Sequence, residues 1–79
     1  MISNINTVHE IINEMREGKG LPKFDSFHKD LDLRNDLGFD SFDLAELTVR
    51  IEDAIKIDVF SNGIITSLGQ VYSMINEDN

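Results

Sequence analysis

Cysteine and tryptophan are absent from this chain of 79 residues, and proline occurs once. Without cysteine there is no disulfide, no thiolate metal ligand and no thiol nucleophile. No apolar run approaches the roughly 20 residues that a membrane-spanning helix needs. The first ten residues, MISNINTVHE, lack the basic and apolar segments of a secretory signal. We therefore expect one small cytoplasmic domain, residues 1–79, that is monomeric and does not insert into membranes.

Basic residues are scarce as well. The chain has 7 Lys and Arg against 15 Asp and Glu, which gives a formal net charge of −8 at pH 7. This charge repels nucleic acid phosphates, so a nucleic-acid-binding role is not expected. If charge selects the partners, they present basic patches. The charge is also compatible with simple solubility, since small domains often carry a net charge of about this size.

Two segments place apolar residues at i, i+3, i+4 and i+7, the pattern of an amphipathic helix. Ser67 and Gln70 fit a capping box before the last of these helices, and Thr7 and Glu10 fit one before the first. The first helix could also begin a turn earlier, near Ile5. The apolar residues are Val8, Ile11, Ile12 and Met15 in the first segment and Leu68, Val71, Tyr72 and Ile75 in the last.

A long segment without a sustained period follows the first helix. Gly18, Gly20 and Pro22 end that helix, and the aperiodic segment extends to Asp40. Such long connections are uncommon in compact domains unless they are functional, internally packed or disordered. We expect this one to pack back on the helices through its spaced apolar residues, which are Phe24, Phe27, Leu31, Leu33 and Leu37.

The second helix is predicted for residues 41–54, with Asp40 as its N-cap. A short helix within residues 56–65 is ambiguous, because Asn62 and Gly63 form a turn signal inside it. No segment alternates as a strand does. The fold class is therefore predicted to be all-α: a small bundle of three main helices plus one short helix, with a long first loop.

This second helix has two apolar faces at about 100° per residue. A surface helix normally has one, and an apolar stripe rimmed by charge is typical of a transient protein interface. The alternative is that the long loop covers Phe42. The core face comprises Leu44, Leu47, Thr48, Ile51, Ala54 and Ile55, and the second stripe comprises Phe42, Ala45 and Val49, flanked by Asp43, Glu46, Glu52 and Asp53.

Ser41 lies just after a glycine turn, among carboxylates, and no catalytic base is near it in the sequence. Gly38 is one position too far away for the G-x-S-x-G elbow of a serine hydrolase. His9 and His28 are interpreted as surface residues rather than as ligands. We expect no catalytic residues, and the chain is not predicted to be an enzyme.

A calcium loop is suggested by the cluster of Asp30, Asp32 and Asp36. The EF-hand pattern beginning at Asp30 would place Arg34 at a ligand position and Ser41 where the closing glutamate belongs. A built metal site is therefore not expected.

Two interpretations of Ser41 remain open from the residues alone. Ser41 or Asp40 can simply cap the helix. Alternatively, Ser41 carries a phosphoryl-linked group, because the free N–H groups and dipole of a helix N-terminus favour a phosphate. The neighbouring Asp40 and Asp43 favour a singly charged diester over a phosphomonoester.

The run DLGFDSFDLAEL resembles the D-x-G-x-D-S-L-x-x-x-E-L region of acyl carrier proteins. Residues 33–38 look like the loop that enters the second helix of that family, and residues 64–71 are similar to its I-T-T-V stretch before the last helix. The resemblance implies that Ser41 receives 4′-phosphopantetheine from coenzyme A and that Asp40 is the preceding aspartate. It also implies that partner enzymes read the second helix at Phe42, Asp43, Ala45, Glu46, Val49, Glu52 and Asp53.

The function implied is an acyl carrier that holds intermediates as thioesters and shuttles them between enzymes, as in fatty acid or polyketide synthesis. Its partners would be a phosphopantetheinyl transferase and acyl-loading, condensing or transferring enzymes with basic patches. Phe42 replaces the usual leucine, Arg50 adds a positive charge, and Ile57-Asp58 stands where the family has Ile-Pro. These departures suggest a specialised carrier. Gly69 is expected to weaken the last helix by up to about 1 kcal/mol relative to alanine.

Two alternatives differ in what Ser41 does. An aminoacyl or peptidyl carrier, including a D-alanyl carrier, shares the fold and the arm, although LGFDS differs from the LGGDS of many peptidyl carriers. A helical adaptor would use the acid-rimmed stripe of the second helix as a docking surface and leave Ser41 unmodified.

Overall fold

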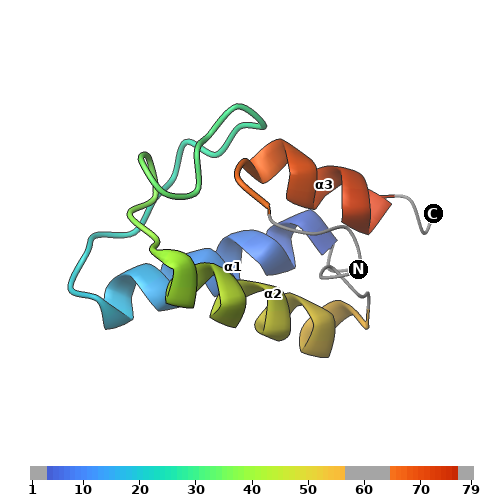
Figure 1. Cartoon of the computed structure of the whole chain (residues 1–79), viewed down its shortest axis with the longest axis horizontal. Coiled ribbons are helices and arrows are strands. Elements are labelled where there is room, and N and C mark those ends of the chain that lie inside the picture. The colour runs from blue at the N-terminus through green and yellow to red at the C-terminus, as the bar shows by residue number, and fades with distance from the viewer. Residues whose placement is uncertain (1–3, 57–64, 77–79) are drawn as a thin grey trace.

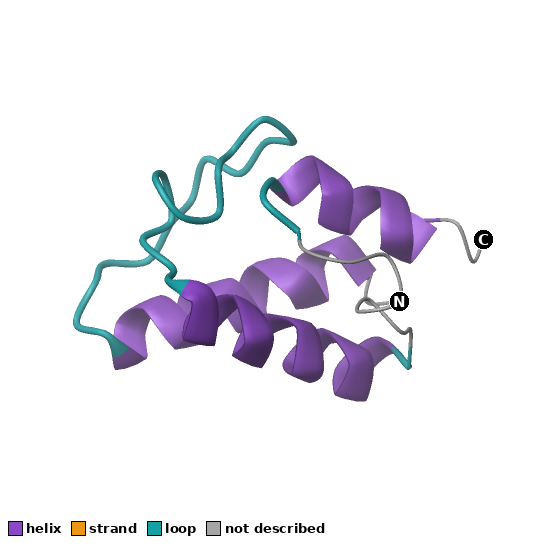
Figure 2. Cartoon of the chain, viewed as in Figure 1, coloured by secondary structure: helices purple, strands orange, loops and turns teal. Residues whose placement is uncertain are grey.

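The computed structural model describes residues 4–56 and 65–76, and this part of the chain contains three helices and no strand. They are α1 (Asn4–Gly18), α2 (Ser41–Ile55) and α3 (Leu68–Asn76) (Figure 2). α1 packs against both other helices, and the long loop, residues 19–40, passes from the end of α1 beside the start of α3 to the start of α2 (Figure 1). The predicted all-α fold with a long first loop is confirmed. The expected short helix falls mostly in residues 57–64, outside the described residues.

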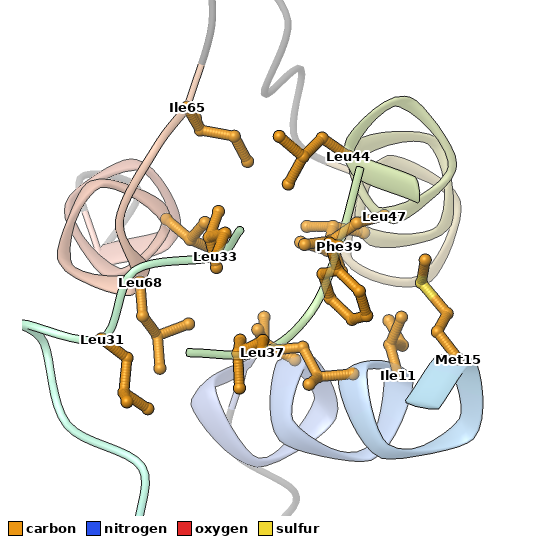
Figure 3. Close-up of a cluster of buried hydrophobic side chains, with 14 of the residues drawn as sticks. Ile11, Met15, Leu31, Leu33, Leu37, Phe39, Leu44, Leu47, Ile65 and Leu68 are labelled. Carbon is orange, nitrogen blue, oxygen red and sulfur yellow. The ribbon is translucent and has the colours of Figure 1, made fainter. Parts of the chain in front are cut away.

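The core takes side chains from all three helices and from the long loop. Figure 3 shows Leu33, Leu37 and Phe39 of the loop between the side chains of the helices. This confirms that the loop packs back on the bundle. The buried apolar side chains are Val8, Ile11, Ile12, Met15, Leu31, Leu33, Leu37, Phe39, Leu44, Leu47, Ile51, Ile65, Leu68, Val71 and Ile75.

Two helix starts can be compared with the sequence predictions. The described part of α1 begins at Asn4, so Thr7 lies inside the helix and the capping box predicted there is wrong. The alternative start near Ile5 is correct, and Ile5 in the first turn is half-buried against the core.

Before α3, Ser67 and Gln70 form the predicted capping box. The Gln70 N–H donates to Ser67 Oγ (3.4 Å), and the Ser67 N–H donates to Gln70 Oε1 (3.1 Å).

Backbone hydrogen bonds join the long loop to the start of α3. The N–H of Leu33 donates to the carbonyl of Thr66 (2.9 Å), and the N–H of Leu68 donates to the carbonyl of Leu31 (3.0 Å). An isolated antiparallel bridge pairs residues 32 and 67. These bonds satisfy loop backbone groups that packing against the core removes from water.

Arg16 of α1 binds the long loop near both of its ends, at Pro22 and at Leu37. It is buried, and its guanidinium donates from Nε to the carbonyl of Pro22 (3.0 Å) and from Nη1 to the carbonyl of Leu37 (2.5 Å). The guanidinium also lies 5.3 Å from the centre of the Phe24 ring. One side chain of α1 therefore holds two distant points of the loop.

Candidate functional site

Ser41 is the first residue of α2, and its side chain is exposed. The capping of this helix end is done by two other residues. Asp40 Oδ1 accepts the N–H of Asp43 (2.9 Å), and Asp43 Oδ2 accepts the N–H of Asp40 (3.0 Å). Asp40 is thus confirmed as the N-cap, and the hydroxyl of Ser41 is not used for capping.

One cationic side chain reaches the Ser41 hydroxyl. Arg34 Nη2 donates to Ser41 Oγ at 3.3 Å. In the sequence Arg34 was considered only as an unsuitable calcium ligand, and its role at Ser41 was missed. No spacing rule could have found it, because the contact depends on how the turn before Gly38 folds.

The acidic residue Asp43 is tied to the end of α1. Lys19 Nζ lies 2.7 Å from Asp43 Oδ2. Partial burial opposes ionisation of Asp43, but hydrogen bonds from Lys19 and from the Asp40 N–H outweigh it and lower the pKa of Asp43 below its ordinary 3.8. The hydrogen bond to Asp43 also raises the pKa of Lys19. Asp43 therefore stabilises the helix start, besides any role in partner binding.

The second apolar stripe of α2 is open to solvent. Phe42 is 86% exposed and Val49 is 56% exposed, and Ala45 between them is also exposed. The long loop does not cover Phe42, so that alternative is wrong. On the opposite side of α2 the predicted core residues are buried as far as Ile51, but Ala54 is exposed and Ile55 only half-buried, because the helix end extends beyond the buried core.

The acidic residues beside this stripe differ in how available they are. Glu46 pairs with Arg50 (2.7 Å), and Arg50 also lies 3.5 Å from Glu14 of α1. Asp53 is exposed, with Lys56 at 3.8 Å. Glu52 is half-buried, and its buried Oε2 has no hydrogen-bond partner within residues 4–56 and 65–76. Three of the four acidic residues that flank the stripe, Asp43, Glu46 and Asp53, are thus paired with cations of the same chain.

The two histidines occupy different environments. His28 is exposed, but His9 is half-buried, which corrects its interpretation as a surface residue. The His9 ring stacks on Phe27 with 4.0 Å between ring centres, and its Nε2 lies 2.5 Å from the Tyr72 hydroxyl. Burial lowers the pKa of His9. This cluster joins α1, the long loop and α3.

Two aspartates of the cluster that was considered and rejected as a calcium loop accept hydrogen bonds from the backbone. Asp32 Oδ1 accepts the N–H groups of Arg34 and Asn35 (both 2.8 Å), and Asp36 Oδ2 accepts the N–H of Asp32 (2.7 Å). Across residues 4–56 and 65–76 there is no group of three His, Cys, Asp or Glu side chains that could hold a metal ion. Nor is any helix in these ranges long and apolar enough to cross a bilayer.

The environment of Ser41 suits a phosphodiester of the kind that the family resemblance implies. The hydroxyl is accessible, and the first N–H groups of a helix lack intrahelical partners. The Arg34 guanidinium stands within hydrogen-bonding distance of Oγ, and the carboxylate of Asp43 is offset by Lys19. The residues present therefore fit a singly charged group at this position.

Comparison with known families agrees with this chemistry. The family model described as "Phosphopantetheine attachment site" matches residues 20–75, more than half of the chain. No curated protein and no solved structure matches. Domains of this family are not catalysts: they carry 4′-phosphopantetheine, which a phosphopantetheinyl transferase attaches, and they present the bound group to partner enzymes. The chain therefore belongs to the phosphopantetheine-attachment family and is a carrier protein.

Proposed function

We propose that the protein is an acyl carrier whose 4′-phosphopantetheine arm is attached to Ser41. The observation that carries this proposal is that the residues that cap α2 are different from the serine at its start. Asp40 and Asp43 cap the helix together, so the exposed hydroxyl of Ser41 contributes nothing to capping. A serine that is exposed, unused by the fold and beside a guanidinium suits covalent modification.

Attachment makes Ser41 the acceptor in a phosphoryl transfer. Ser41 Oγ bonds to the phosphorus of coenzyme A that carries pantetheine, the bond from that phosphorus to the pyrophosphate bridging oxygen breaks, and adenosine 3′,5′-bisphosphate leaves. Among the described residues the hydrogen-bond partner of Ser41 Oγ is the guanidinium of Arg34, which is not a base, and we propose that the transferase provides the base that accepts the serine proton. Once bound, the arm contributes a thiol that forms thioesters, while the chain positions the arm and is recognised by partners.

The exposed stripe of α2 is proposed as the partner-binding surface. Phe42, Ala45 and Val49 form its apolar centre, and the acidic side chains of Asp43, Glu46, Glu52 and Asp53 border it. Acyl-loading, condensing and acyl-transfer enzymes would meet it with basic patches. Three of these carboxylates have cations of the same chain as neighbours, so we assign charge steering to the net charge of −8 as a whole. An association rate that does not fall as salt rises would contradict charge steering.

The cargo is proposed to be acyl rather than aminoacyl or peptidyl, with fatty acid or polyketide synthesis as the setting. The sequence support is the LGFDS run. Phe39, which stands where many peptidyl carriers have the second glycine, is buried in the core and is therefore part of how this fold is built. Loading assays with matched panels of acyl and aminoacyl donors, including D-alanine, distinguish the two classes.

Intact mass spectrometry tests the attachment site. The protein is incubated with coenzyme A, Mg²⁺ and a broad-specificity phosphopantetheinyl transferase, alongside Ser41→Ala and the control Ser26→Ala. Ser26 is also an exposed serine beside an aspartate. We expect one phosphopantetheine on the wild type and on Ser26→Ala and none on Ser41→Ala. Loading of Ser41→Ala would overturn the assignment of Ser41.

A further inference from the structure

Arg34 differs from Lys19 and Arg50 because its guanidinium has no acidic partner among the described residues. Lys19 pairs with Asp43, and Arg50 pairs with Glu46. In the described ranges Arg34 forms no ion pair, and its guanidinium donates instead to the neutral hydroxyl of Ser41 (3.3 Å). A full positive charge is therefore held beside an atom that cannot neutralise it.

The backbone of Arg34 is fixed relative to α2. Its N–H donates to Asp32 Oδ1 (2.8 Å), and its carbonyl accepts the N–H of Gly38 (3.0 Å). The preceding residue, Leu33, is fully buried. Its carbonyl accepts the N–H of Phe39 (3.1 Å), and Phe39 lies two residues before Ser41. These contacts hold the Arg34 backbone near the start of α2, at a distance from which its side chain reaches Ser41 Oγ.

A diester on Ser41 would put a negative charge next to two carboxylates, those of Asp40 and Asp43. Asp43 already has Lys19, but neither carboxylate can donate a hydrogen bond when ionised. A guanidinium presents two parallel N–H donors that match two oxygens of a phosphate group. Arg34 is the described side chain that combines this shape with contact to Ser41 Oγ.

We propose that Arg34 is a positioning residue for the arm: its guanidinium pairs with the non-bridging oxygens of the phosphodiester on Ser41. The proposal rests on Ser41 being the attachment site. The pairing fixes the base of the arm against the turn formed by residues 32–38 and leaves the distant thiol free to enter a partner enzyme. Arg34 contributes nothing to the chemistry at the thiol.

The experiment compares phosphorus NMR spectra of four loaded proteins: wild type, Arg34→Gln, Arg34→Lys and Arg50→Gln. Arg50→Gln is the matched control, since it removes the same charge from an exposed arginine of α2 that has no contact with Ser41. Intact mass first establishes that one arm is present. If the wild type itself cannot be loaded, the proposed function fails and this inference with it; if it is loaded, the spectra test Arg34 alone.

We expect Arg34→Gln to move the phosphorus resonance and to lower its transverse relaxation rate, because a diester that is not paired moves more freely. Arg34→Lys should restore part of both changes, and Arg50→Gln should cause neither. Equal spectra for Arg34→Gln and the wild type would overturn the proposal, as would an equal shift in Arg50→Gln.

A second measurement needs no variant, so it decides the matter even if Arg34→Gln loads or folds poorly. The side-chain nitrogen and proton resonances of Arg34 in the isotopically labelled wild type are compared before and after loading. We expect the guanidinium resonances of Arg34 to shift on loading and those of Arg50 to stay in place. Unchanged Arg34 resonances would overturn the pairing.

Discussion

The N–H of Gly69 donates to the carbonyl oxygen of Lys29 at 2.8 Å, and a Cβ built on Gly69 would stand 2.8 Å from the same oxygen. The start of α3 thus approaches the backbone of the long loop as closely as a hydrogen bond permits. This is the reason for a glycine inside a helix, where its intrinsic propensity is poor.

Gly69→Ala is therefore expected to destabilise the protein by about 1–3 kcal/mol, the range for inserting atoms into a packed site. Helix propensity alone predicts the opposite sign, a gain of up to about 1 kcal/mol. Urea unfolding followed by circular dichroism measures the difference. Gly18→Ala is the control, because a Cβ there meets no atom within 4 Å. A stabilised Gly69→Ala protein would refute the close approach.

Regular patterns in the sequence predicted the helices because burial and capping follow the 3.6-residue period. The stripe of α1, the Ser67–Gln70 box and the Asp40 cap are local features, and the structure has all of them. What local patterns could not supply is contact between distant segments. Gly69 was interpreted from helix propensity because its neighbour, Lys29, lies 40 residues earlier in the sequence.

The candidate site was predictable to the same extent. The position of Ser41 at a helix start and the second apolar stripe at Phe42 follow from local sequence patterns, whereas the exposure of that stripe was decided by the structure. The pairing of Asp43 with Lys19 and the contact of Arg34 with Ser41 do not, since each depends on how the loop returns to α2. Burial of Arg16 was likewise missed, because arginine is rarely buried without an acidic partner.

Arg16→Met is expected to cost about 2–4 kcal/mol, although methionine fills much of the same volume. The substitution removes the donors to the carbonyls of Pro22 and Leu37 and leaves polar groups without partners. Arg50→Met, which removes an exposed arginine and its surface ion pairs, should cost no more than about 1 kcal/mol. Denaturant unfolding measures both. Equal losses would show that the buried hydrogen bonds of Arg16 contribute no more to stability than the surface ion pairs of Arg50.

Stability should fall as pH drops from 7 to 5 because of His9. Burial lowers the pKa of folded His9 below its ordinary 6.5, so the folded protein binds a proton at this site less readily than the unfolded chain. The contribution of neutral His9 is complete above about pH 6.5 and is lost as pH falls towards the folded pKa. His9→Phe should flatten the unfolding free energy over this range. His28→Phe, at an exposed position, is the control, and equal flattening there would contradict the assignment.

A second loss of stability is expected at lower pH from Asp43. Hydrogen bonds from Lys19 and Asp40, opposed by partial burial, lower the pKa of folded Asp43 below 3.8. The stabilisation is therefore present above about pH 4 and is lost as pH falls through the folded pKa. Asp43→Asn should reduce stability at pH 7 and weaken the dependence on pH below 4. Asp53→Asn, an exposed acid of the same helix, is the control, and a matching change there would refute the role of the Lys19–Asp43 pair.

Phe42 is expected to matter for partners and not for folding. Its side chain is 86% exposed, so Phe42→Ala should change the unfolding free energy by less than about 0.5 kcal/mol. If the apolar stripe enters a partner, burying this ring contributes roughly 1.5–3 kcal/mol, which corresponds to a tenfold to hundredfold weaker complex in the variant.

Surface plasmon resonance with an immobilised phosphopantetheinyl transferase, together with loading rates, tests this expectation. Phe42→Leu introduces the leucine that is usual in acyl carrier proteins at this position and should keep most of the affinity. Glu10→Ala is the control and should leave the affinity unchanged, because Glu10 lies on α1. A Phe42→Ala protein that binds and loads like the wild type would show that the transferase recognises the chain elsewhere. The same assay at rising salt separates the two contributions: Phe42 should act mainly on the dissociation rate, and the net charge of −8 mainly on the association rate.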